Sequence, residues 1–474
     1  KLEIDICKPY FVGQKAILKK VESFPDIVGS GIIKGGKSKK EFSFEWEPPE
    51  GAAARETCLY GEHLKLADRK RIAAFAGWKL PLWFSSIAEE HRAVRTAAGL
   101  FDVSHMGLLE FAGPGAESFL DMTTTAFTPA LVPGQAKYSY LLAPDGRVID
   151  DIMLYRLAAE RFIVVVNAAN AEEDEAWWRA AATGEIVLDL ENREMCFKGK
   201  LAIRNLKDPE SGDERKVDIA LQGPASTAVL RRVIGGNGFF AGIRELRRFE
   251  FAAGEMMGTS AVVARTGYTG EPVGYEILIH PQAAPALWNA ILAAGEPYGV
   301  RPAGLGARDS TRTEAGLPLH GHELEGEHRV NPIEAGYGSF VKNAKPFYVG
   351  RRAMVRAALD RARAVARFRV TGRGPRMVRP GHVVVEGRKG KFAGVVTSCT
   401  LVGESEVGMA IVGRAHAQAG TPLGIFAYTP KDGKPAAKGF DELSEGDWLP
   451  VSKTAVVISR FPDPRNPFPG EDDV

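Results

Sequence analysis

The sequence predicts an α+β fold, in which antiparallel strands are interrupted by helices without strict alternation. Two observations support this prediction. Strand-like runs come in series joined by turn residues, as at 137–142, 148–156 and 162–166, and helix patterns lie between such series. The chain has 474 residues, 45% of them hydrophobic. That length suggests about two to four domains with ample apolar material for their cores.

The composition argues against several classes of protein. There are 61 Lys+Arg and 59 Asp+Glu residues, so bulk charge does not favour binding to nucleic acid. No apolar run approaches the roughly 18 residues that a membrane span needs. The 4 cysteines lie far apart, which excludes a disulfide scaffold and a cysteine zinc site. The sequence opens without a signal-peptide pattern, so we expect a cytoplasmic protein that neither enters a membrane nor binds nucleic acid.

Residues 1–57 differ from the rest and predict an N-terminal extension. They are rich in lysine and end in a proline-rich linker. Lys8–Ala16 resembles Lys345–Ala353, which indicates either a remnant of a duplicated unit or a chance similarity. Gly31–Ser38 matches the phosphate-loop pattern letter for letter, but the residues after Ser38 form a poor helix pattern. Nucleotide binding is therefore disfavoured.

Local signals predict where some helices and loops begin and end. Ser86 and Glu89 form a capping box at the start of a helix, and Gly99 is its expected C-cap. Asn170 is the expected N-cap of a second helix, whose first turn is acidic. The charged stretch 199–216 is typical of an inserted surface loop. Beyond Val383, strand and turn patterns predict a small β-barrel or sandwich.

Two adjacent carboxylates lie in the middle of the strand predicted over 148–156. Side chains alternate between the faces of a strand, so Asp151 should share a face with Ile149 and Tyr155, and Asp150 should lie on the other. An unpaired buried carboxylate costs several kcal/mol, as a rough estimate, so at least one of the two needs a partner or a ligand. A functional carboxylate and a structural aspartate that accepts backbone bonds both remain open.

Three further patterns are ambiguous. Arg265–Glu271 is a glycine-rich turn before a strand, which is typical of a hairpin loop but would also place Tyr268 and Glu276 at the mouth of a pocket. Arg308 lies in the first turn of a helix, where a cation opposes the macrodipole, so it either pairs with a nearby acid or faces an anion. Histidines and glutamates crowd 320–328 without a metal-ligand spacing, and we predict no metal site.

Taken in order, a series of stretches resembles one family, the aminomethyltransferase (T-protein) of the glycine cleavage system. The resemblance runs from about residue 58 to about residue 460. The matching stretches are Phe75–Trp78, Ala98–Gly107, Gly146–Asp151, Val165–Asn170, Leu221–Pro224, Arg265–Glu271, Arg301–Asp309, Asn331–Gly336 and Lys345–Gly350.

The family implies a three-lobed molecule with tetrahydrofolate in a central channel and with discontinuous first and second domains. On this chain, the first folate-binding domain would comprise 58–106 with 217–325, and the second 107–216 with 326–360. A C-terminal β domain, barrel or sandwich, would follow over 361–474. Residues 1–57 would precede these domains as an extension.

The family also implies an activity, a co-substrate and a partner. A one-carbon unit carried as an aminomethyl group on a lipoylated carrier protein is transferred to tetrahydrofolate, and ammonia is released. No metal or redox cofactor is implied, and we expect a monomer or a weak dimer. By position, Asp151 matches the key carboxylate. The residues that match folate contacts are Tyr138, Tyr155, Val165, Asn167, Tyr268, Glu276 and Arg308.

Other functions are compatible with the same fold. Related folate-dependent enzymes demethylate methyl sulfonium or methyl ether substrates, and others are modules of dimethylglycine- or sarcosine-oxidising enzymes. A non-catalytic folate-binding paralogue is a further alternative. Such paralogues carry a Lys-Gly-Cys-Tyr-x-Gly-Gln type of motif, and the corresponding stretch Lys345–Arg351 lacks the cysteine.

Overall fold

The computed structural model describes residues 53–372, 376–387, 390–427 and 447–462, and these residues form two compact units. Unit 1 contains Met106–Ser211 and Asn331–Arg361; unit 2 contains 53–105, Gly212–Val330 and the chain from Ala362 onward. The N-terminal extension and the phosphate-loop-like stretch fall outside the described residues. The predicted division of unit 2 into a folate-binding domain and a separate C-terminal domain stays a prediction.

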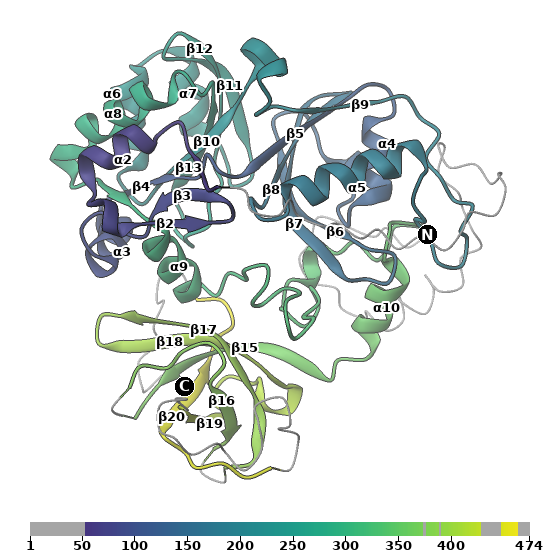
Figure 1. Ribbon diagram of the computed structural model, residues 1–474, viewed down its shortest axis with the longest axis vertical. Helices are drawn as coiled ribbons and strands as arrows, with labels where there is room; N and C mark the ends of the chain where they lie inside the picture. The colour runs from purple at the N-terminus through teal and green to yellow at the C-terminus, as the bar shows by residue number, and fades with distance from the viewer. Residues whose placement is uncertain (1–52, 373–375, 388–389, 428–446, 463–474) are drawn as a thin grey trace. The chain divides into compact units, whose positions relative to one another are not determined.

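Unit 1 is built on a five-stranded antiparallel sheet in the order β6-β7-β8-β5-β9 (Figure 1). Its strands are β5 (Gly107–Ala112), β6 (Ala136–Leu142), β7 (Val148–Ala158), β8 (Arg161–Val166) and β9 (Ala202–Asn205). The helices of the unit are α4 (Ala116–Thr123), α5 (Ala171–Thr183) and α10 (Arg351–Leu359). Apolar residues of α4 and α5, including Phe119 and Trp178, pack with the sheet into one buried core.

Unit 2 contains a six-stranded sheet in the order β11-β12-β13-β10-β4-β14. Its strands are β4 (Gly99–Asp102), β10 (Val217–Gln222), β11 (Phe251–Met256), β12 (Thr259–Ala264), β13 (Gly274–Ile279) and β14 (Arg301–Ala303). Helices α6 (Ser226–Ile234), α7 (Gly238–Glu245) and α8 (Ala284–Gly295) pack on one face, where Leu230, Ile243 and Trp288 join the apolar side of the sheet. Helices α6, α7 and α8 do not cover the opposite face of this sheet.

The described residues of unit 2 also include a small sheet, three further α-helices and a barrel. The small sheet has the order β1-β3-β2, formed by β1 (Arg55–Glu56), β2 (Ile72–Phe75) and β3 (Trp78–Pro81). The helices are α2 (Tyr60–Leu66), α3 (Ile87–Thr96) and α9 (Leu305–Glu314).

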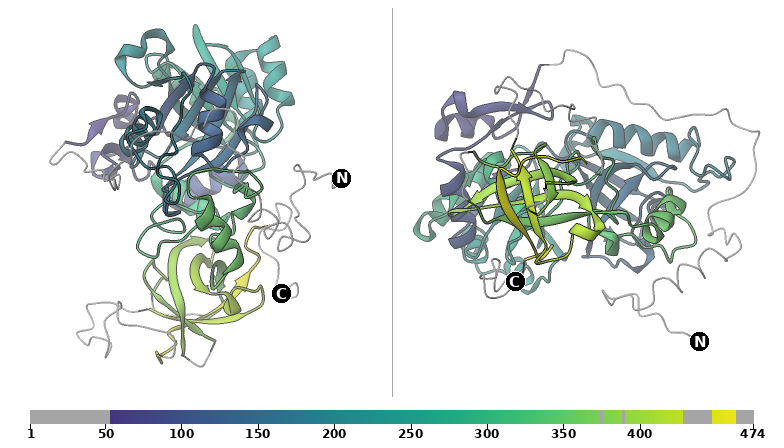
Figure 2. Two further views of the ribbon diagram at one scale, coloured as in Figure 1. Left: turned by 90° about the vertical axis from the view of Figure 1, so that its right-hand side faces the viewer. Right: turned by 90° about the horizontal axis from the view of Figure 1, so that it is seen from below.

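The C-terminal strands close into a six-stranded barrel in the order β15-β18-β17-β16-β19-β20, drawn in green to yellow in Figure 2. They are β15 (Arg363–Val370), β16 (Val383–Glu386), β17 (Phe392–Val402), β18 (Ser405–Gly413), β19 (Pro422–Phe426) and β20 (Lys453–Ile458). Full closure removes the unpaired edges that an open sheet would expose. The barrel begins at Arg363, earlier than the strand pattern beyond Val383 predicted.

Two local predictions were wrong. Helix α3 begins after Ser86, whose hydroxyl accepts from the Glu89 amide at 3.3 Å as predicted, but it ends at Thr96, and Gly99 opens strand β4 instead of capping the helix. The stretch 199–216 is not simply a loop. It contains β9, which pairs with β5 because Ala202 to Asn205 extend the sheet at its edge.

Candidate active site

One face of the unit 1 sheet carries the predicted catalytic carboxylate. Met153 on β7 lies opposite Tyr138 on β6 and opposite Val165 on β8. Residues directly opposite each other point to the same face of a sheet, and so do Asp151 and Tyr155, which lie two residues to either side of Met153. The structure therefore brings four of the predicted site residues onto one face of three adjacent strands.

A β-bulge in β7 changes which residues share a face of the strand with the two aspartates. Asp150 pairs with Leu141, but Leu142 pairs with Val148, so Ile149 is an extra residue in β7. The bulge interrupts the alternation. Ile149 consequently lies in the apolar core and not on the face of Asp151, where we predicted it.

Asp151 is half-buried and held by two hydrogen bonds from neighbouring side chains. The Tyr138 hydroxyl donates to Oδ2 at 2.8 Å, and Asn167 Nδ2 donates to Oδ1 at 2.9 Å. Burial, together with the Asp151 carboxylate, raises the pKa of Tyr138 well above its usual value. Tyr138 therefore keeps its proton at neutral pH and remains a donor to Asp151.

Aromatic rings surround this carboxylate's tyrosine partner. The Tyr138 ring makes edge contacts with Tyr140, Tyr337 and Phe340, at centroid distances of 5.3, 6.0 and 4.9 Å. Sequence reasoning missed Tyr337 and Phe340, which reach the site from a segment about two hundred residues further along the chain. A partly exposed carboxylate beside aromatic rings can accept N–H groups of a planar ligand or take up a proton from it.

Asp150 is fully buried and satisfied by amides. Its Oδ1 accepts from Asn167 Nδ2 at 2.8 Å and Asn170 Nδ2 at 2.6 Å, and its Oδ2 accepts from the Asn167 backbone N–H at 2.8 Å. Asn170 precedes α5 as predicted, but its side chain makes no capping hydrogen bond to that helix. The side chain of Asn170 binds Asp150 instead, because a buried carboxylate needs donors more than a helix end near solvent does.

In unit 2, two carboxyl groups share the sheet face that α6, α7 and α8 do not cover. Glu276 on β13 pairs with Ala220 on β10, and Asp218 on β10 pairs with Leu278 on β13. Cross-strand pairing and alternation therefore place Asp218 and Glu276 on the same face. Ile219 and Ile277 point the other way into the core.

The predicted contacts of unit 2 are arranged around Glu276 and Tyr268. Thr266 donates its hydroxyl to Glu276, and Tyr268 donates its hydroxyl to the Pro318 carbonyl. The guanidinium of Arg308 lies over the Tyr268 ring, 5.0 Å from its centroid. Thr266 was missed at the sequence level.

Arg308 does not pair with the acids of its own helix, which was one of the two alternatives left open. Asp309 accepts from Arg312 at 2.6 Å, and Glu314 accepts from Arg95 at 2.7 Å. Arg308 instead stacks on Tyr268 and borders a small pocket whose lining also includes Phe101 and Asp102. The position of Arg308 fits the other alternative, a cation that faces an anionic group.

Asp218 is a further residue that sequence reasoning missed. It is 2% exposed, and its Oδ1 has no hydrogen-bond partner among the described residues. Burial and the nearby Glu276 carboxylate raise the pKa of Asp218 well above its usual value, against the opposing effect of Arg308. A signal was available, since Asp218 and Gln222 are polar at even spacing in an otherwise apolar strand.

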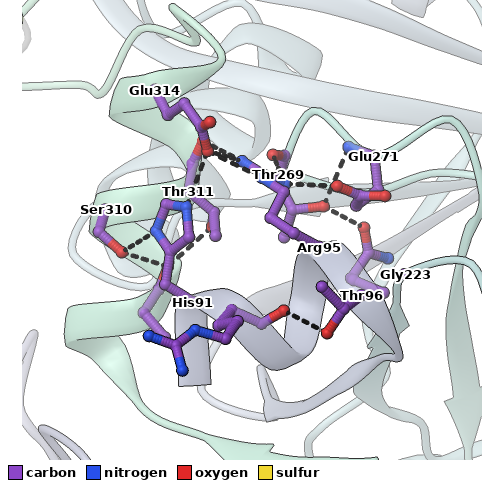
Figure 3. Close-up of polar contacts among 12 residues, drawn as sticks. His91, Arg95, Thr96, Gly223, Thr269, Glu271, Ser310, Thr311 and Glu314 are labelled. Carbon is purple, nitrogen blue, oxygen red and sulfur yellow. Dashed lines mark hydrogen bonds and ion pairs between the residues drawn. The ribbon is translucent and has the colours of Figure 1, made fainter. Parts of the chain in front are cut away.

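A polar cluster supports the turn of Tyr268 and the helix of Arg308 (Figure 3). Arg95 on α3 donates to the Thr269 carbonyl at 2.9 Å and to Glu271 at 2.7 Å, both in the glycine-rich turn. The same guanidinium binds Glu314 on α9, whose other neighbour is His91 Nε2 at 2.8 Å. Arg95 thus links the glycine-rich turn to helix α9.

Comparison with known proteins identifies the family. The family model described as the GCVT N-terminal domain matches residues 63–345. An aminomethyltransferase of Chlorobaculum parvum is 40% identical over 352 residues, which is 74% of this chain and 88% of that protein. The chain belongs to the aminomethyltransferase family. A further family member, from Bacillus subtilis, is 40% identical over 272 residues, 57% of this chain and 67% of that protein.

A solved structure agrees with this assignment. The crystal structure of the glycine cleavage system aminomethyltransferase T from Bartonella henselae matches with a TM-score of 0.68 and 29% identity, covering 86% of this chain and 97% of that one. The predicted family and the predicted α+β fold are therefore confirmed.

Among the residues that the structure describes, no group of three or more His, Cys, Asp or Glu residues is arranged to hold a metal ion. Within the same residues, no helix combines the length and apolar character needed to cross a membrane. Glu323, which the sequence placed in a histidine-rich cluster, forms an ion pair with Arg312 at 2.7 Å.

Proposed function

We propose that this member of the aminomethyltransferase family transfers an aminomethyl group from the lipoyl arm of a carrier protein to tetrahydrofolate. In the balanced reaction, the carbon's bonds to sulfur and to its amino nitrogen break, and two bonds form to folate nitrogens. The two protons displaced from those nitrogens leave with the thiol and with ammonia. The products are 5,10-methylene-tetrahydrofolate, ammonia and the dihydrolipoyl arm.

The residues present fit a reduced pteridine. Its 2-amino-4-oxo edge presents paired N–H donors, which a carboxylate accepts in a bidentate manner. Glu276 offers such a carboxylate, close to Asp218, whose buried Oδ1 has no hydrogen-bond partner among the described residues. Arg308 and Tyr268 add a cation and an aromatic face. When bound, tetrahydrofolate would supply the two nitrogens that receive the one-carbon unit.

The proposal depends mainly on the hydrogen bonds and the partial exposure of Asp151. Tyr138 and Asn167 hold its carboxylate in a fixed orientation while leaving it half-buried and reachable. An oriented carboxylate accepts a proton from a nitrogen that forms a new bond, and it stabilises positive charge that develops on a nearby iminium group. We assign both of these roles to Asp151.

The carrier and the donor are also part of the proposal. The Bartonella henselae protein is an aminomethyltransferase of the glycine cleavage system. A lipoylated carrier protein of that system is therefore the donor we propose for this chain. Methyl sulfonium, methyl ether and dimethylglycine donors are the alternatives, and each can be offered to the same preparation.

The experiment measures methylene-tetrahydrofolate formation from an aminomethyl-loaded lipoyl carrier, with the alternative donors run in parallel. Asp151→Asn should lower turnover by about 10²–10⁴-fold, because a neutral amide neither takes up a proton nor stabilises an iminium charge. The matched control is Asp145→Asn, an exposed acid in the turn before β7, which should keep normal turnover. Near-normal turnover of a folded Asp151→Asn variant would contradict the role of Asp151.

Binding of the pterin edge is tested separately at Glu276. Glu276→Ala should weaken tetrahydrofolate binding by roughly 10–100-fold in calorimetry, the loss of about 1.5–3 kcal/mol typical of hydrogen bonds to a charged group. Thermal stability should change little by comparison. Glu255→Ala removes an exposed acid from β11 of the same sheet and serves as control. Unchanged affinity of Glu276→Ala would place the pterin elsewhere.

A further inference from the structure

Asp174 is a buried carboxyl group that the proposed function does not use. It lies in the first turn of α5 and is 0% exposed. Neither of its carboxyl oxygens accepts a hydrogen bond from an N–H or O–H donor of the described residues. An ionised carboxylate without donors or water is strongly unfavourable, so this group requires another explanation.

The largest charge effects on Asp174 come from negative groups. These groups are Asp150 and Asp151 on β7 and Glu173 on its own helix. Burial, followed by the Asp150 carboxylate, raises the pKa of Asp174 well above its usual value. Asp174 lies close to Asp150, because its backbone N–H donates to the Asn170 carbonyl at 2.8 Å and Asn170 Nδ2 donates to Asp150 Oδ1 at 2.6 Å. A hydrogen bond between two carboxyl groups requires that one of them carries a proton.

The hydrogen-bond pattern indicates which of the two carboxyl groups would carry such a proton. Asp150 accepts N–H groups on both oxygens, two on Oδ1 from Asn167 and Asn170 and one on Oδ2 from the Asn167 backbone. A carboxyl group that accepts on both oxygens behaves as the ionised partner. Asp174 accepts no N–H or O–H group among the described residues, so it is the side chain that is free to carry a proton and to donate it to Asp150.

We propose that Asp174 is a protonated carboxylic acid at neutral pH, which donates a hydrogen bond to Asp150 and thereby positions Asp151 through Asn167. Asn167 Nδ2 binds Asp150 Oδ1 at 2.8 Å and Asp151 Oδ1 at 2.9 Å, so it links the two aspartates. Asp174 is a positioning residue and does not touch substrate. The functional part of this inference rests on the role proposed above for Asp151.

The proposal predicts a defined response to pH. In the unfolded chain Asp174 ionises near pH 4, whereas in the folded protein it stays protonated to a higher pH. The folded state then binds one more proton than the unfolded state, so this group's contribution to stability is full below about pH 4 and is lost as the pH rises through the native pKa. Ionisation would place two negative charges together and release Asn167 from its position between the aspartates.

Two substitutions at Asp174 distinguish the effect of losing the hydrogen-bond donor from the effect of changing the side-chain volume. Asp174→Asn keeps the shape and a hydrogen-bond donor but cannot ionise, whereas Asp174→Leu keeps similar bulk and removes the donor. Glu172→Gln, an exposed acid in the same helical turn, is the matched control. The full chain of each variant is assayed for turnover, for the KM of tetrahydrofolate and for thermal midpoint across pH 5–9.

Asp174→Leu should lower kcat by about tenfold or more, the loss expected for one hydrogen bond to a charged group, with little change in KM. Asp174→Asn should restore most of that kcat at neutral pH. Its thermal midpoint should decline less with rising pH than that of the wild type and of Glu172→Gln. Infrared spectra of the wild type at neutral pH should contain a protonated carboxylic acid band that Asp174→Asn removes.

The outcomes distinguish this inference from the proposed function. If the wild type transfers a one-carbon unit but Asp174→Asn loses as much kcat as Asp174→Leu, or if the carboxylic acid band is absent, the inference is wrong while the proposed function stands. If the wild type accepts none of the donors, the proposed function fails, and the infrared and thermal measurements still decide whether Asp174 holds a proton. Should Asp174→Leu not fold, the pH profile of Asp174→Asn decides.

Discussion

Each unit buries a group of carboxyl side chains, and the two groups are held in opposite ways. In unit 1, the hydrogen bonds to Asp150 and Asp151 come from asparagine amides and a tyrosine hydroxyl. In unit 2, Glu314 accepts from Arg95 at 2.7 Å, and Glu323 accepts from Arg312 at 2.7 Å. The donors named here are neutral in the first group and are arginines in the second. The contrast concerns these two groups and not the whole units, because buried Glu110 of unit 1 also accepts from arginines, Arg161 and Arg204, each at 2.6 Å.

The difference affects which carboxyl groups can exchange protons. Burial alone would raise the pKa of Glu323, but the Arg312 guanidinium outweighs it and holds that pKa below its usual value. Burial raises the pKa of Asp174, and there the neighbouring aspartates add to the effect. Arginine also helps to hold the pKa of Glu314 below its usual value, so Glu314 and Glu323 remain charged. Asp174, beside the amide-held aspartates, is the carboxyl group for which we propose a retained proton.

The largest effect should follow from removing the arginine of the buried pair in unit 2. Arg312→Met leaves Glu323, which is 0% exposed, without its cation. Breaking a buried ion pair on one side costs about 3–5 kcal/mol of the free energy of unfolding. Urea denaturation at neutral pH should show a loss of this size. Arg312 also donates to Ser398 on β17 at 2.8 Å, so the loss should include weaker attachment of α9 to the barrel.

The pH dependence of this variant tests the cause. In the wild type, the lowered pKa of Glu323 makes its contribution present above the unfolded pKa and lost as pH falls through the folded value. In Arg312→Met, the uncompensated Glu323 should protonate, so the deficit should shrink at acidic pH. The double variant Arg312→Met/Glu323→Met should recover most of the stability. A deficit that persists in the double variant would attribute the loss to packing rather than to charge.

The sequence predicted the elements whose signals are local. The Ser86 capping box, the hairpins of 137–166 and the helix that carries Arg308 depend on neighbouring residues, and the structure contains all of them. Wrong predictions arose where distant partners decide the structure. Strand β9 forms because β5 offers it an edge, and Asn170 turns away from its helix because Asp150 is buried nearby.

The candidate site was predictable to a similar extent. The strand pattern drew attention to the pair Asp150 and Asp151 without choosing between them. The family resemblance indicated Asp151, and also Tyr138, Asn167 and Glu276. The supporting residues were not predictable. Arg95 donates to Glu271, which lies 176 positions further along the chain, and only the folded structure brings the two residues together. The bulge at Ile149 likewise depends on the pairing with β6 and leaves no mark in the hydrophobic pattern.

A smaller effect is expected at Arg95, which tests whether an arginine-held cluster also serves binding. Arg95→Met removes donors to Glu314, Glu271 and the Thr269 carbonyl, but the side chain is 23% exposed, so water compensates in part. The expected loss is about 1–3 kcal/mol of the free energy of unfolding. Tetrahydrofolate affinity should fall as well, because Thr269 adjoins Tyr268 in the turn that Arg95 fastens to α9.

Arg92→Met supplies the matched control, since Arg92 lies on the same helix α3 with an exposed side chain and should change stability by less than about 0.5 kcal/mol. Folate titration calorimetry of both variants, at a temperature where each is folded, separates two outcomes. A loss of affinity in Arg95→Met alone would show that the cation-paired cluster orders the binding turn. Unchanged affinity with reduced stability would confine that cluster to a structural role and sharpen the contrast with the amide-held aspartates of unit 1.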